Sequence, residues 1–314
     1  MAWRGMLLHQ QLLLLIGLFI SAVTEAFQPN TSCERSCGSV SIPYPFGTSK
    51  GCYLDESFLV TCHHTFGTPR PFLSNGDFGE IPLLDISLDG ELRVSTSVAR
   101  DCYNESNVHI HDNDRYSRLN LSKFAISYTK NKLTAVGCDT LVKIKGLHEH
   151  NYSSGSTSTC DDMDSVFNGS CSNNGCCQAS IPQGVTEFTL MVGSFFNHSM
   201  VHDLNPCGFG FVVEEKAYNF SSLDLKNLQN RETVPVVLDW AVGNETCEGA
   251  QRNKTSYACK ATNSECYNST NDPGYRCNCS SGFAGNPYLL DGCQGTNTYM
   301  AYYICLFIFC FFFG

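Results

Sequence analysis

The chain has 314 residues, of which 19 are cysteines, and its formal net charge is −10. This cysteine content is typical of proteins from oxidising compartments, where disulfides persist. No C-x-x-C spacing of the kind used by zinc and thioredoxin-like redox sites occurs in the sequence. The acidic balance also argues against nucleic acid as a partner, because contacts to phosphate need a basic surface.

The first residues predict a secretory signal peptide over residues 1–26. Arg4 supplies the positive n-region, residues 7–20 form a mostly apolar core, and Ala26 places a small residue at the expected cleavage point. A retained signal anchor is the alternative, but the apolar run is short for a bilayer span. We therefore expect a chain of the secretory pathway that faces outward.

Eleven Asn-x-Ser/Thr sequons support the same location, because such sites carry bulky sugars on the surface of secreted proteins. Asn278 is the least favourable of them, since Cys279 occupies its middle position. Glycans are expected at Asn30, Asn104, Asn120, Asn151, Asn168, Asn197, Asn219, Asn244, Asn253 and Asn268.

Residues 27–240 predict a first domain that is all-β and loop-rich. Short apolar segments alternate with Gly, Pro, Asn and Asp, which favours many short strands joined by turns. The polar, low-complexity residues 151–160 predict an exposed loop. One short helix is expected near residues 222–229, with Ser222 as its cap and Leu225 and Leu228 on one face. The strands are expected at residues 40–42, 58–61, 81–88, 92–98, 123–128, 133–136, 141–144, 187–192 and 209–213.

Residues 241–294 form a second, cysteine-dense segment with six cysteines, which is too small to bury a sufficient core without disulfides. Sequence alone allows fifteen pairings of six cysteines. The spacing, with Cys277-x-Cys279 followed by Gly282-Phe283, resembles an EGF-like module. That resemblance implies three disulfides, namely Cys247–Cys266, Cys259–Cys277 and Cys279–Cys293.

Residues 295–314 end the chain in an apolar tail, in which residues 299–313 are almost wholly apolar and aromatic. As a helix this run would be about 22 Å long, which is short of a hydrocarbon core of about 30 Å. A short transmembrane segment, a lipid-anchor signal and an alternative transcript end all remain open. Membrane association through this tail is one expectation.

Several strings together resemble the ectodomain of plant wall-associated receptor kinases. They include Cys33-Glu-Arg-Ser-Cys37-Gly38, Ile42-Pro43-Tyr44-Pro45-Phe46-Gly47 and Gly175-Cys176-Cys177-Gln178. Others are Arg100-Asp101-Cys102-Tyr103, Val136-Gly137-Cys138-Asp139 and Leu238-Asp239-Trp240. The resemblance covers about residues 30–293 and implies a galacturonan-binding wall-associated domain followed by an EGF-like module. It therefore implies pectin or oligogalacturonides as the ligand and a cell-wall location.

Two departures from the family pattern matter. The sequence contains no phosphate loop, catalytic loop or Asp-Phe-Gly motif of a kinase. In addition, Ser156 stands where the family usually has the first cysteine of a Gly-Cys-x-Ser-x-Cys string. The first domain then holds eleven cysteines, an odd number. We expect one of these thiols to stay free or to pair between chains, with Ser156 as the lost partner.

No catalytic or metal-binding constellation is predicted, and no cofactor is implied. The pairs His109/His111 and His148/His150 have a spacing that would let a strand present both rings to a metal, but they are better interpreted as polar loop residues. The sequence has no Gly-x-Ser-x-Gly elbow. Adjacent carboxylates such as Asp161-Asp162 would point apart on a strand, which does not suit glycoside hydrolysis. An enzyme is therefore not expected.

The candidate ligand site is basic. If the segments around residues 123–136 and 141–145 pair as strands, their lysines form one positive stripe, with two arginines just upstream. Such a stripe would hold the carboxylates of a polyuronate, and arginine would add bidentate contacts. An ordinary charged strand face is the competing interpretation. The candidate residues are Arg115, Arg118, Lys130, Lys132, Lys143 and Lys145.

Together these features predict an extracellular ectodomain that binds pectin-like polysaccharide and has no kinase activity. It would be tethered by its tail or secreted as a soluble competitor of full-length receptors. The alternative is a structural or protein-interaction module, a soluble or tethered decoy that binds no sugar. Full-length receptor kinases and small wall proteins are the protein partners considered.

Overall fold

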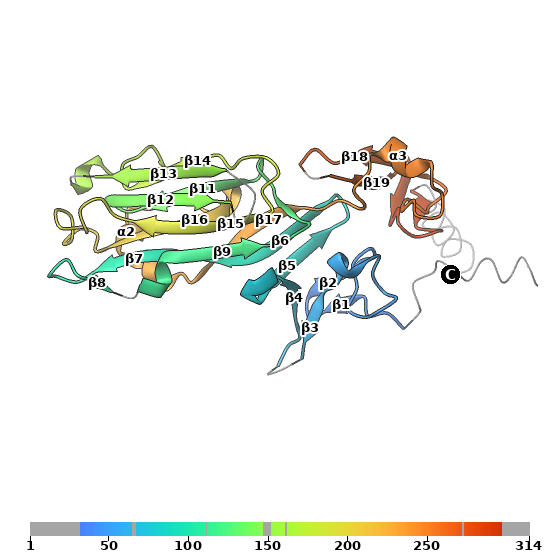
Figure 1. Cartoon of the computed structure of the whole chain (residues 1–314), viewed down its shortest axis with the longest axis horizontal. Helices are drawn as coiled ribbons and strands as arrows, with labels where there is room; N and C mark the ends of the chain where they lie inside the picture. The colour runs from blue at the N-terminus through green and yellow to red at the C-terminus, as the bar shows by residue number, and fades with distance from the viewer. Residues whose placement is uncertain are drawn as a thin grey trace, which may run out of the picture.

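A computed structural model describes residues 32–64, 67–110, 112–146, 152–160, 162–271 and 273–296. The predicted signal peptide, the apolar tail after residue 296, Asn30 and Asn151 lie outside these ranges. In Figure 1 the long strands form one end of an elongated molecule, and the cysteine-dense segment with β18, β19 and α3 forms the other. No helix among the described residues is long and apolar enough to span a bilayer.

Three antiparallel sheets make up most of the chain. One sheet contains, in spatial order, β10 (Ala125–Ile126), β17 (Thr233–Asp239), β6 (Glu91–Ser97), β5 (Glu80–Ser87), β4 (Arg70–Ser74) and β3 (Thr61–His63). The second contains β14 (Cys176–Ala179), β11 (Asn131–Val136), β16 (Cys207–Glu214), β7 (Ala99–Tyr103) and β8 (His109–Ile110). The third contains β13 (Ser153–Thr159), β12 (Asp139–Lys145), β15 (Glu187–Gly193) and β9 (Tyr116–Asn120).

The remaining elements are short. A small hairpin, β1 (Ser36–Cys37) with β2 (Val40–Ser41), begins the described chain. The helical turns are η1 (Glu56–Phe58), η2 (Gly76–Phe78), η3 (Asp112–Arg115), η4 (Met163–Ser165), η5 (Glu215–Ala217), α2 (Asp224–Asn227) and η6 (Leu228–Asn230). The cysteine-dense segment holds α3 (Cys247–Gln251), β18 (Ser264–Asn268), β19 (Tyr275–Cys279), β20 (Phe283–Gly285) and β21 (Cys293–Gly295). The prediction of an all-β, disulfide-rich fold with little helix is confirmed.

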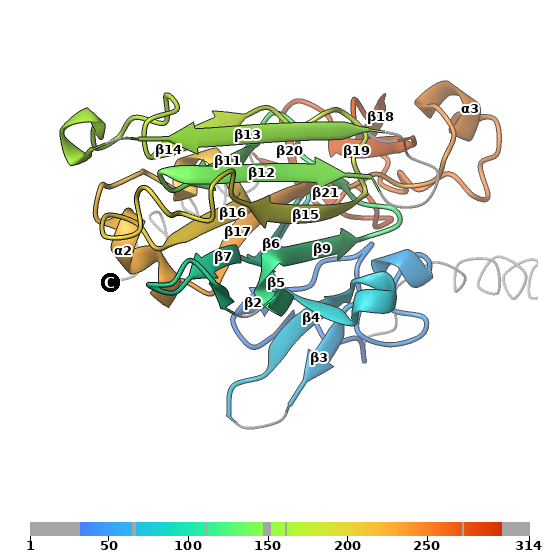
Figure 2. The same ribbon diagram turned by 60° about the vertical axis from the view of Figure 1, so that its left-hand side comes forward.

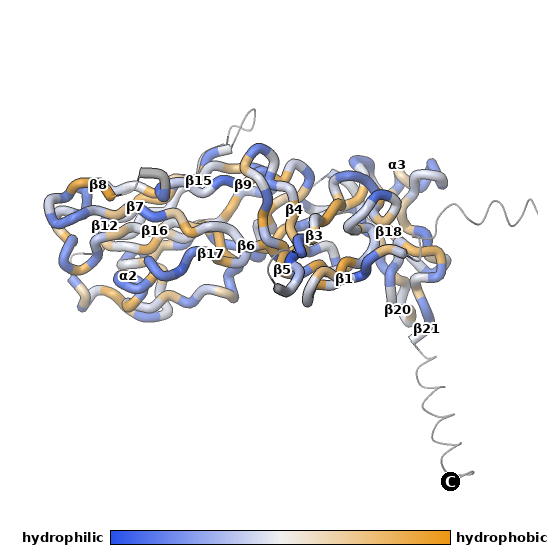
Figure 3. Tube along the Cα trace, turned by 90° about the horizontal axis from the view of Figure 1, so that it is seen from below, coloured by the Kyte–Doolittle hydropathy of each residue, from blue (hydrophilic) through white to orange (hydrophobic). Residues whose placement is uncertain are grey.

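The sheets of β11 and β12 pack face to face, and the alternation along β12 explains which of its side chains enter the contact. In β12 the side chains of Val142 and Ile144 are fully buried while their neighbours Lys143 and Lys145 are exposed. This period of two places one apolar row of β12 in the interior, whereas β11 is buried along almost its whole length. Figure 3 shows the resulting interleaving of hydrophobic and hydrophilic residues along the strands.

Aromatic side chains join the sheets to the N-terminal hairpin region. Phe46 packs edge-on against Phe58 and Trp240, with ring centroids 5.0 and 5.2 Å apart. Trp240 is fully buried, and its indole N–H donates to the carbonyl of Ser87. Such rings bury large apolar areas and contribute much of the free energy that stabilises a hydrophobic core. Trp240 also contacts Tyr288, 5.7 Å away in the cysteine-dense segment, so the hydrophobic core continues across the junction.

Polar contacts reinforce that junction. Asn271 donates to the carbonyl of Ile126 and to the Asp239 carboxylate, at 2.9 and 2.7 Å, and accepts from the backbone N–H of Gly184. The Arg276 guanidinium donates to the carbonyl of Trp240 at 2.7 Å. Because Asn271 is buried and its amide fully engaged, the segment is fixed on the sheets by specific bonds as well as by apolar packing.

Eight disulfides are formed within the described chain. Three of them join the same cysteines that the EGF-like resemblance implies, Cys247–Cys266, Cys259–Cys277 and Cys279–Cys293. The other five are Cys33–Cys52, Cys37–Cys62, Cys102–Cys207, Cys138–Cys160 and Cys171–Cys176. Cys177 is the one cysteine among the described residues without a disulfide partner.

Two local predictions need correction. Residues 153–159 form strand β13 and not a loop, because Ser156 and Ser158 face the interior and are small enough to be buried there. The helix near residue 222 begins only at Asp224, and Leu223 at its N-cap makes no side-chain capping bond. Leu225 and Leu228 are both buried on one side, as the spacing predicts.

Candidate functional site

The outward face of the four-stranded sheet β13–β12–β15–β9 carries a group of cations. Lys145 is in register with Thr189 of β15, and Thr189 with Arg118 of β9. Lys143 lies two residues along β12, in register with Met191 and through it with Tyr116. The two lysine Cα atoms are therefore about 7 Å apart, and Arg118 lies two strands away at about 10 Å. Figure 2 shows the four strands side by side.

Arg118 lies between two exposed aromatic rings. Its guanidinium carbon is 5.6 Å from the ring centre of Phe78 and 5.7 Å from that of Tyr116, within the range of cation–π contacts. Phe78 and Tyr116 are 38% and 43% exposed, so both residues are accessible to solvent. An arginine flanked in this way is held in place while its donors stay available.

A buried asparagine fixes the position of Phe78. Asn75 precedes η2, donates to the carbonyl of Arg118 at 3.3 Å and accepts from the backbone N–H of Asn120 at 2.7 Å. These two bonds dock the turn that carries Phe78 onto β9. Gly76 adopts φ 57°, in the left-handed region that favours glycine, and a Cβ there would also lie 3.0 Å from the Asn120 side chain. The same turn carries Asp77, an exposed acid.

The three cations of this face have no acidic partner in the part of the chain that the structure describes. Among the described residues, no ion pair joins Lys143, Lys145 or Arg118 to a carboxylate. The exposed residues within the four strands include no acid, and Glu187 at the start of β15 is buried. We call Lys143, Lys145, Arg118, Tyr116 and Phe78 the cationic face.

The other three predicted ligand residues lie elsewhere. The expected pairing of residues 123–136 with 141–145 is wrong, because Gly137, at φ 140°, turns the chain so that β11 and β12 enter different sheets. Lys130 pairs with Glu91 at 3.2 Å, and Lys132 lies 4.0 Å from Glu215. Arg115 turns toward the buried carboxylate of Asp101, 3.3 Å away. The six residues therefore do not form one stripe.

Neither aromatic member of the cationic face is among the ligand residues predicted from the sequence. Tyr116 has a readable signal, because Tyr116-x-Arg118 has the period of a strand and would present both side chains to solvent. Phe78 has no such signal, since its place depends on the docking of η2 by Asn75 across more than 40 residues of chain.

The sequons within the described residues lie away from the centre of this face. Asn104, Asn168, Asn197 and Asn219 are exposed on loops and turns outside the sheet. Asn120 is half-buried at the end of β9. Asn244, Asn253, Asn268 and Asn278 are exposed in the cysteine-dense segment. Within the described chain no sequon asparagine belongs to β12, which carries the two lysines, or to its neighbours β13 and β15.

A buried polar network orders the loop at the far end of the same sheet. The Asp139 carboxylate accepts from the Ser194 hydroxyl and from the backbone N–H groups of Phe195, Phe196 and His198. Burial raises the pKa of Asp139, but these hydrogen bonds outweigh it and hold the pKa below its usual range. The loop is thus fixed by a carboxylate that stays ionised.

His198 and Tyr103 stack beside this carboxylate. Burial lowers the pKa of His198, whose Nδ1–H donates to the carbonyl of Asn205 at 2.8 Å, so the ring is neutral. Burial, with help from the Asp101 carboxylate, raises the pKa of Tyr103 to about 12. Of the His109/His111 pair considered as a metal site, His109 contacts the Asp101 carboxylate at 2.5 Å. His111 lies outside the described residues. These groups stabilise the loop and do not present a nucleophile with a base.

Other side chains that gather near one another offer no better metal site. Glu34, Cys62 and His64 lie within metal-ligand range of one another in the described chain. Cys62, however, is bonded to Cys37 and cannot supply a thiolate. The cationic face therefore remains the strongest candidate for ligand binding.

Comparison with known proteins identifies the family to which the chain is related. Residues 33–96 match the family described as wall-associated receptor kinase galacturonan-binding. Wall-associated receptor kinase 2 of Arabidopsis thaliana is 39% identical over 293 residues, which cover 92% of this chain and 38% of that protein. Wall-associated receptor kinases 1 and 5 of the same plant are each 37% identical, over 92% and 91% of this chain and 38% of each relative. No solved structure matches the chain.

The chain thus has a disulfide-rich, all-β fold, and its residues 33–96 match the galacturonan-binding family of wall-associated receptor kinases. The chain is homologous to the ectodomains of wall-associated receptor kinases, as the sequence motifs predict. It spans 38% of the length of these curated relatives.

Proposed function

We propose that this chain is an extracellular, wall-facing ectodomain that binds pectin, and that the cationic face is its binding surface. The observation that carries the proposal is the group of unpaired cations on one open sheet face, with Arg118 held between two exposed rings. The match of residues 33–96 to a galacturonan-binding family supports the same ligand class. Homogalacturonan and oligogalacturonides are the ligands proposed.

The chemistry of this face suits a polyuronate. Each sugar of a galacturonan carries a carboxylate, which Lys143, Lys145 and Arg118 can pair with, and an apolar ring face, which can lie against Tyr116 or Phe78. A single exposed ion pair contributes only about 0.2–1 kcal/mol. Several repeated contacts along one polymer add up, so we expect binding that requires chain length and weakens with salt.

The proposal includes location and partners. The chain would lie outside the cell, in the wall or at the plasma membrane, with the apolar tail as a means of membrane association. It would bind without turnover of its ligand. Full-length receptor kinases and small wall proteins are proposed as protein partners, which a decoy or co-receptor role would require.

A binding assay on defined polysaccharides tests the ligand class. Purified glycosylated protein is titrated against de-esterified oligogalacturonides, the same chains fully methyl-esterified, and a neutral glucan. We expect binding to the first only, because esterification removes the carboxylate charge. Equal binding to all three would contradict a uronate site. Absence of binding to every polymer would favour the interaction module that binds no sugar, and release of shorter oligomers would indicate an enzyme.

A matched pair of variants tests the surface. Lys143→Gln with Lys145→Gln removes two cations from the cationic face, while Lys130→Gln with Lys132→Gln removes two that already lie beside Glu91 and Glu215. At about 0.7 kcal/mol for each lysine, the first pair should weaken oligogalacturonide binding roughly tenfold. The second pair should leave it nearly unchanged. The reverse result would place the ligand on the other sheet.

A further inference from the structure

The turn between β7 and β8 holds the side chain of Asn104 in one orientation. Its carbonyl oxygen accepts from the backbone N–H groups of Ser106 and Val108, at 3.0 and 2.9 Å. The backbone of Asn104 also bonds to Val108 and Asn107, and Asn107 adopts φ 56° to close the turn. The side-chain nitrogen Nδ2 has no partner within the described residues. It is also the atom to which an N-linked sugar is attached.

Asn104 begins a sequon, Asn104-Glu105-Ser106, and this sequon forms part of a cavity wall. A cavity of about 500 Å³ is lined by Asn104 and its neighbours from Tyr103 to Ser106, together with His202 and Pro206. A larger cavity of about 900 Å³ adjoins it and shares Glu105, His202 and Pro206 with it. Both are open grooves and not enclosed cavities, and their volumes lie within the range of ligand pockets, about 300–1,000 Å³.

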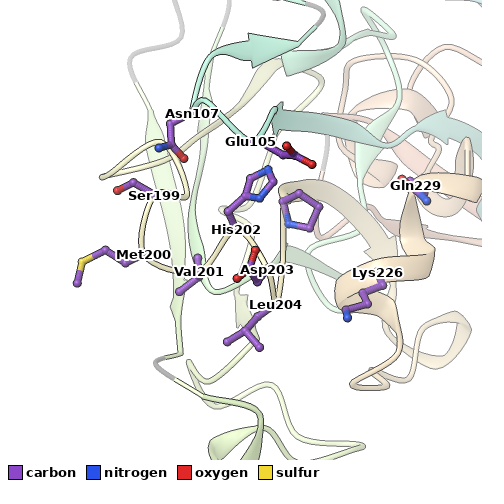
Figure 4. Close-up of a pocket in the computed structure, with 11 residues that line it drawn as sticks. Glu105, Asn107, Ser199, Met200, Val201, His202, Asp203, Leu204, Lys226 and Gln229 are labelled. Carbon is purple, nitrogen blue, oxygen red and sulfur yellow. The ribbon is translucent and has the colours of Figure 1, made fainter.

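The larger cavity presents groups that suit a sugar (Figure 4). Glu105 and Asn107 come from the β7–β8 turn, while Lys226 and Gln229 come from α2 and η6 on the other side. Together they offer hydrogen-bond donors and acceptors to hydroxyl and acetamido groups. Met200 also lines the cavity and is 83% exposed, which leaves a large apolar side chain uncovered.

The wall that faces the sequon is firmly placed. His202 hydrogen-bonds to the carbonyl of Tyr103 at 3.1 Å, which ties the loop after β15 to β7. The start of that loop is held by the four hydrogen bonds to the Asp139 carboxylate. A cavity between two fixed walls can accept a ligand without first being ordered, which lowers the entropic cost of binding.

We propose that the larger cavity binds the proximal N-acetylglucosamine residues of a glycan that is attached to Asn104. The sugar is attached at the rim, so its effective concentration at the cavity is high and weak contacts suffice to hold it. The inference rests on the proposed glycosylation of Asn104 and is independent of galacturonan binding. The bound glycan covers Met200 and contacts both the β7–β8 turn and α2.

Resistance of this glycan to enzymatic release tests the proposal. The protein is secreted from a mammalian host, and occupancy of each sequon is established by glycopeptide mass spectrometry. The folded protein is then treated with peptide-N-glycosidase F, and conversion of each glycosylated asparagine to aspartate is followed over time. Asn253 is the internal reference, because it is exposed, its carbonyl oxygen is held by the N–H of Thr255, and it lines neither cavity.

We expect Asn104 to be converted at least tenfold more slowly than Asn253 in the folded protein, and equally fast after denaturation. Met200→Ser with Gln229→Ala should raise the native rate at Asn104 and leave Asn253 unchanged. Leu223→Ser is the matched control, because Leu223 is 67% exposed but does not line the cavity. Equal native rates at the two sites, an unoccupied Asn104, or no effect of the cavity variants would overturn the proposal.

Discussion

A disulfide between position 156 and Cys177 provides a sharp test of how the two sheets meet. β13 and β14 are edge strands of facing sheets, and their contacts fix the register between them. Ser154 Oγ donates to the carbonyl of Ser180 at 3.5 Å, and Ser158 Oγ to that of Asn173 at 3.2 Å. Ser156 lies midway along β13, so it faces the middle of β14, where Cys177 is located.

Both side chains point into the interior of the sandwich. Ser156 is 4% exposed, and its hydroxyl has no hydrogen-bond partner, which is an unfavourable way to bury a polar group. Cys177 is opposite the buried Ala135 of β11 and packs on the same core. The structure thus leaves one free thiol in the first domain, as the odd number of cysteines predicts.

The expected gain follows from the loop that Ser156→Cys would close. About 20 residues separate the two positions, and the Cys171–Cys176 bond shortens this path in the unfolded chain. Loop-closure entropy then gives roughly 2–3 kcal/mol. In a chain of this size that corresponds to a rise in melting temperature of about 5 °C.

Non-reducing peptide mapping and thermal unfolding measure the outcome. Ser156→Cys should yield a crosslinked pair of peptides containing positions 156 and 177, with a stability gain that reductant abolishes. Thr157→Cys is the control, because residue 157 faces solvent and should leave both thiols free. A folded Ser156→Cys protein with two free thiols, or crosslinking in the control, would refute the register that we infer.

Two further predictions concern buried polar groups. Asp139→Asn removes the carboxylate that fixes the loop after β15 and should lower the free energy of unfolding by about 3 kcal/mol at pH 7. The pKa of Asp139 is lowered in the folded state, so the stabilisation that its carboxylate gives is complete above about pH 4, the ordinary pKa of an aspartate. This stabilisation is lost as the pH falls through the pKa of Asp139 in the folded protein. The urea unfolding curves of the parent and of Asp139→Asn should therefore converge in acid. Asn271→Ala breaks three hydrogen bonds at the junction with the cysteine-dense segment and should cost about 2–4 kcal/mol. Limited proteolysis should then cleave between residues 240 and 247 faster than in the parent, and unchanged cleavage would mean that apolar packing alone holds the segment.

Alternating apolar residues identified the strands that form the core. β5, β6, β15 and β16 were predicted near their observed bounds, because Val, Ile, Leu and Phe recur on one face of each. β13 was missed because Ser, Thr and Gly give no hydrophobic period, although Ser156 and Ser158 are buried. A strand that is held by its neighbours need not show a pattern of its own.

The candidate site, too, can be predicted from the sequence only in part. Lys143, Lys145 and Arg118 could be selected from parity and charge, but parity cannot tell which strands are neighbours. The corner at Gly137 sends β11 and β12 to different sheets and separates Lys130 and Lys132 from the other lysines. Phe78 joins the site only through contacts of Asn75 with β9. These are long-range choices that local sequence does not encode.

Observation of individual lysines during ligand binding tests the central claim most directly. Reductive dimethylation with a carbon-13 label keeps the lysine charge and gives one resonance for each side chain. On titration with de-esterified oligogalacturonide, we expect saturable shifts of the Lys143 and Lys145 resonances, while those of Lys130 and Lys132 stay in place. Shifts confined to Lys130 and Lys132, or a bound oligomer that moves none of the four, would contradict the assignment of the cationic face.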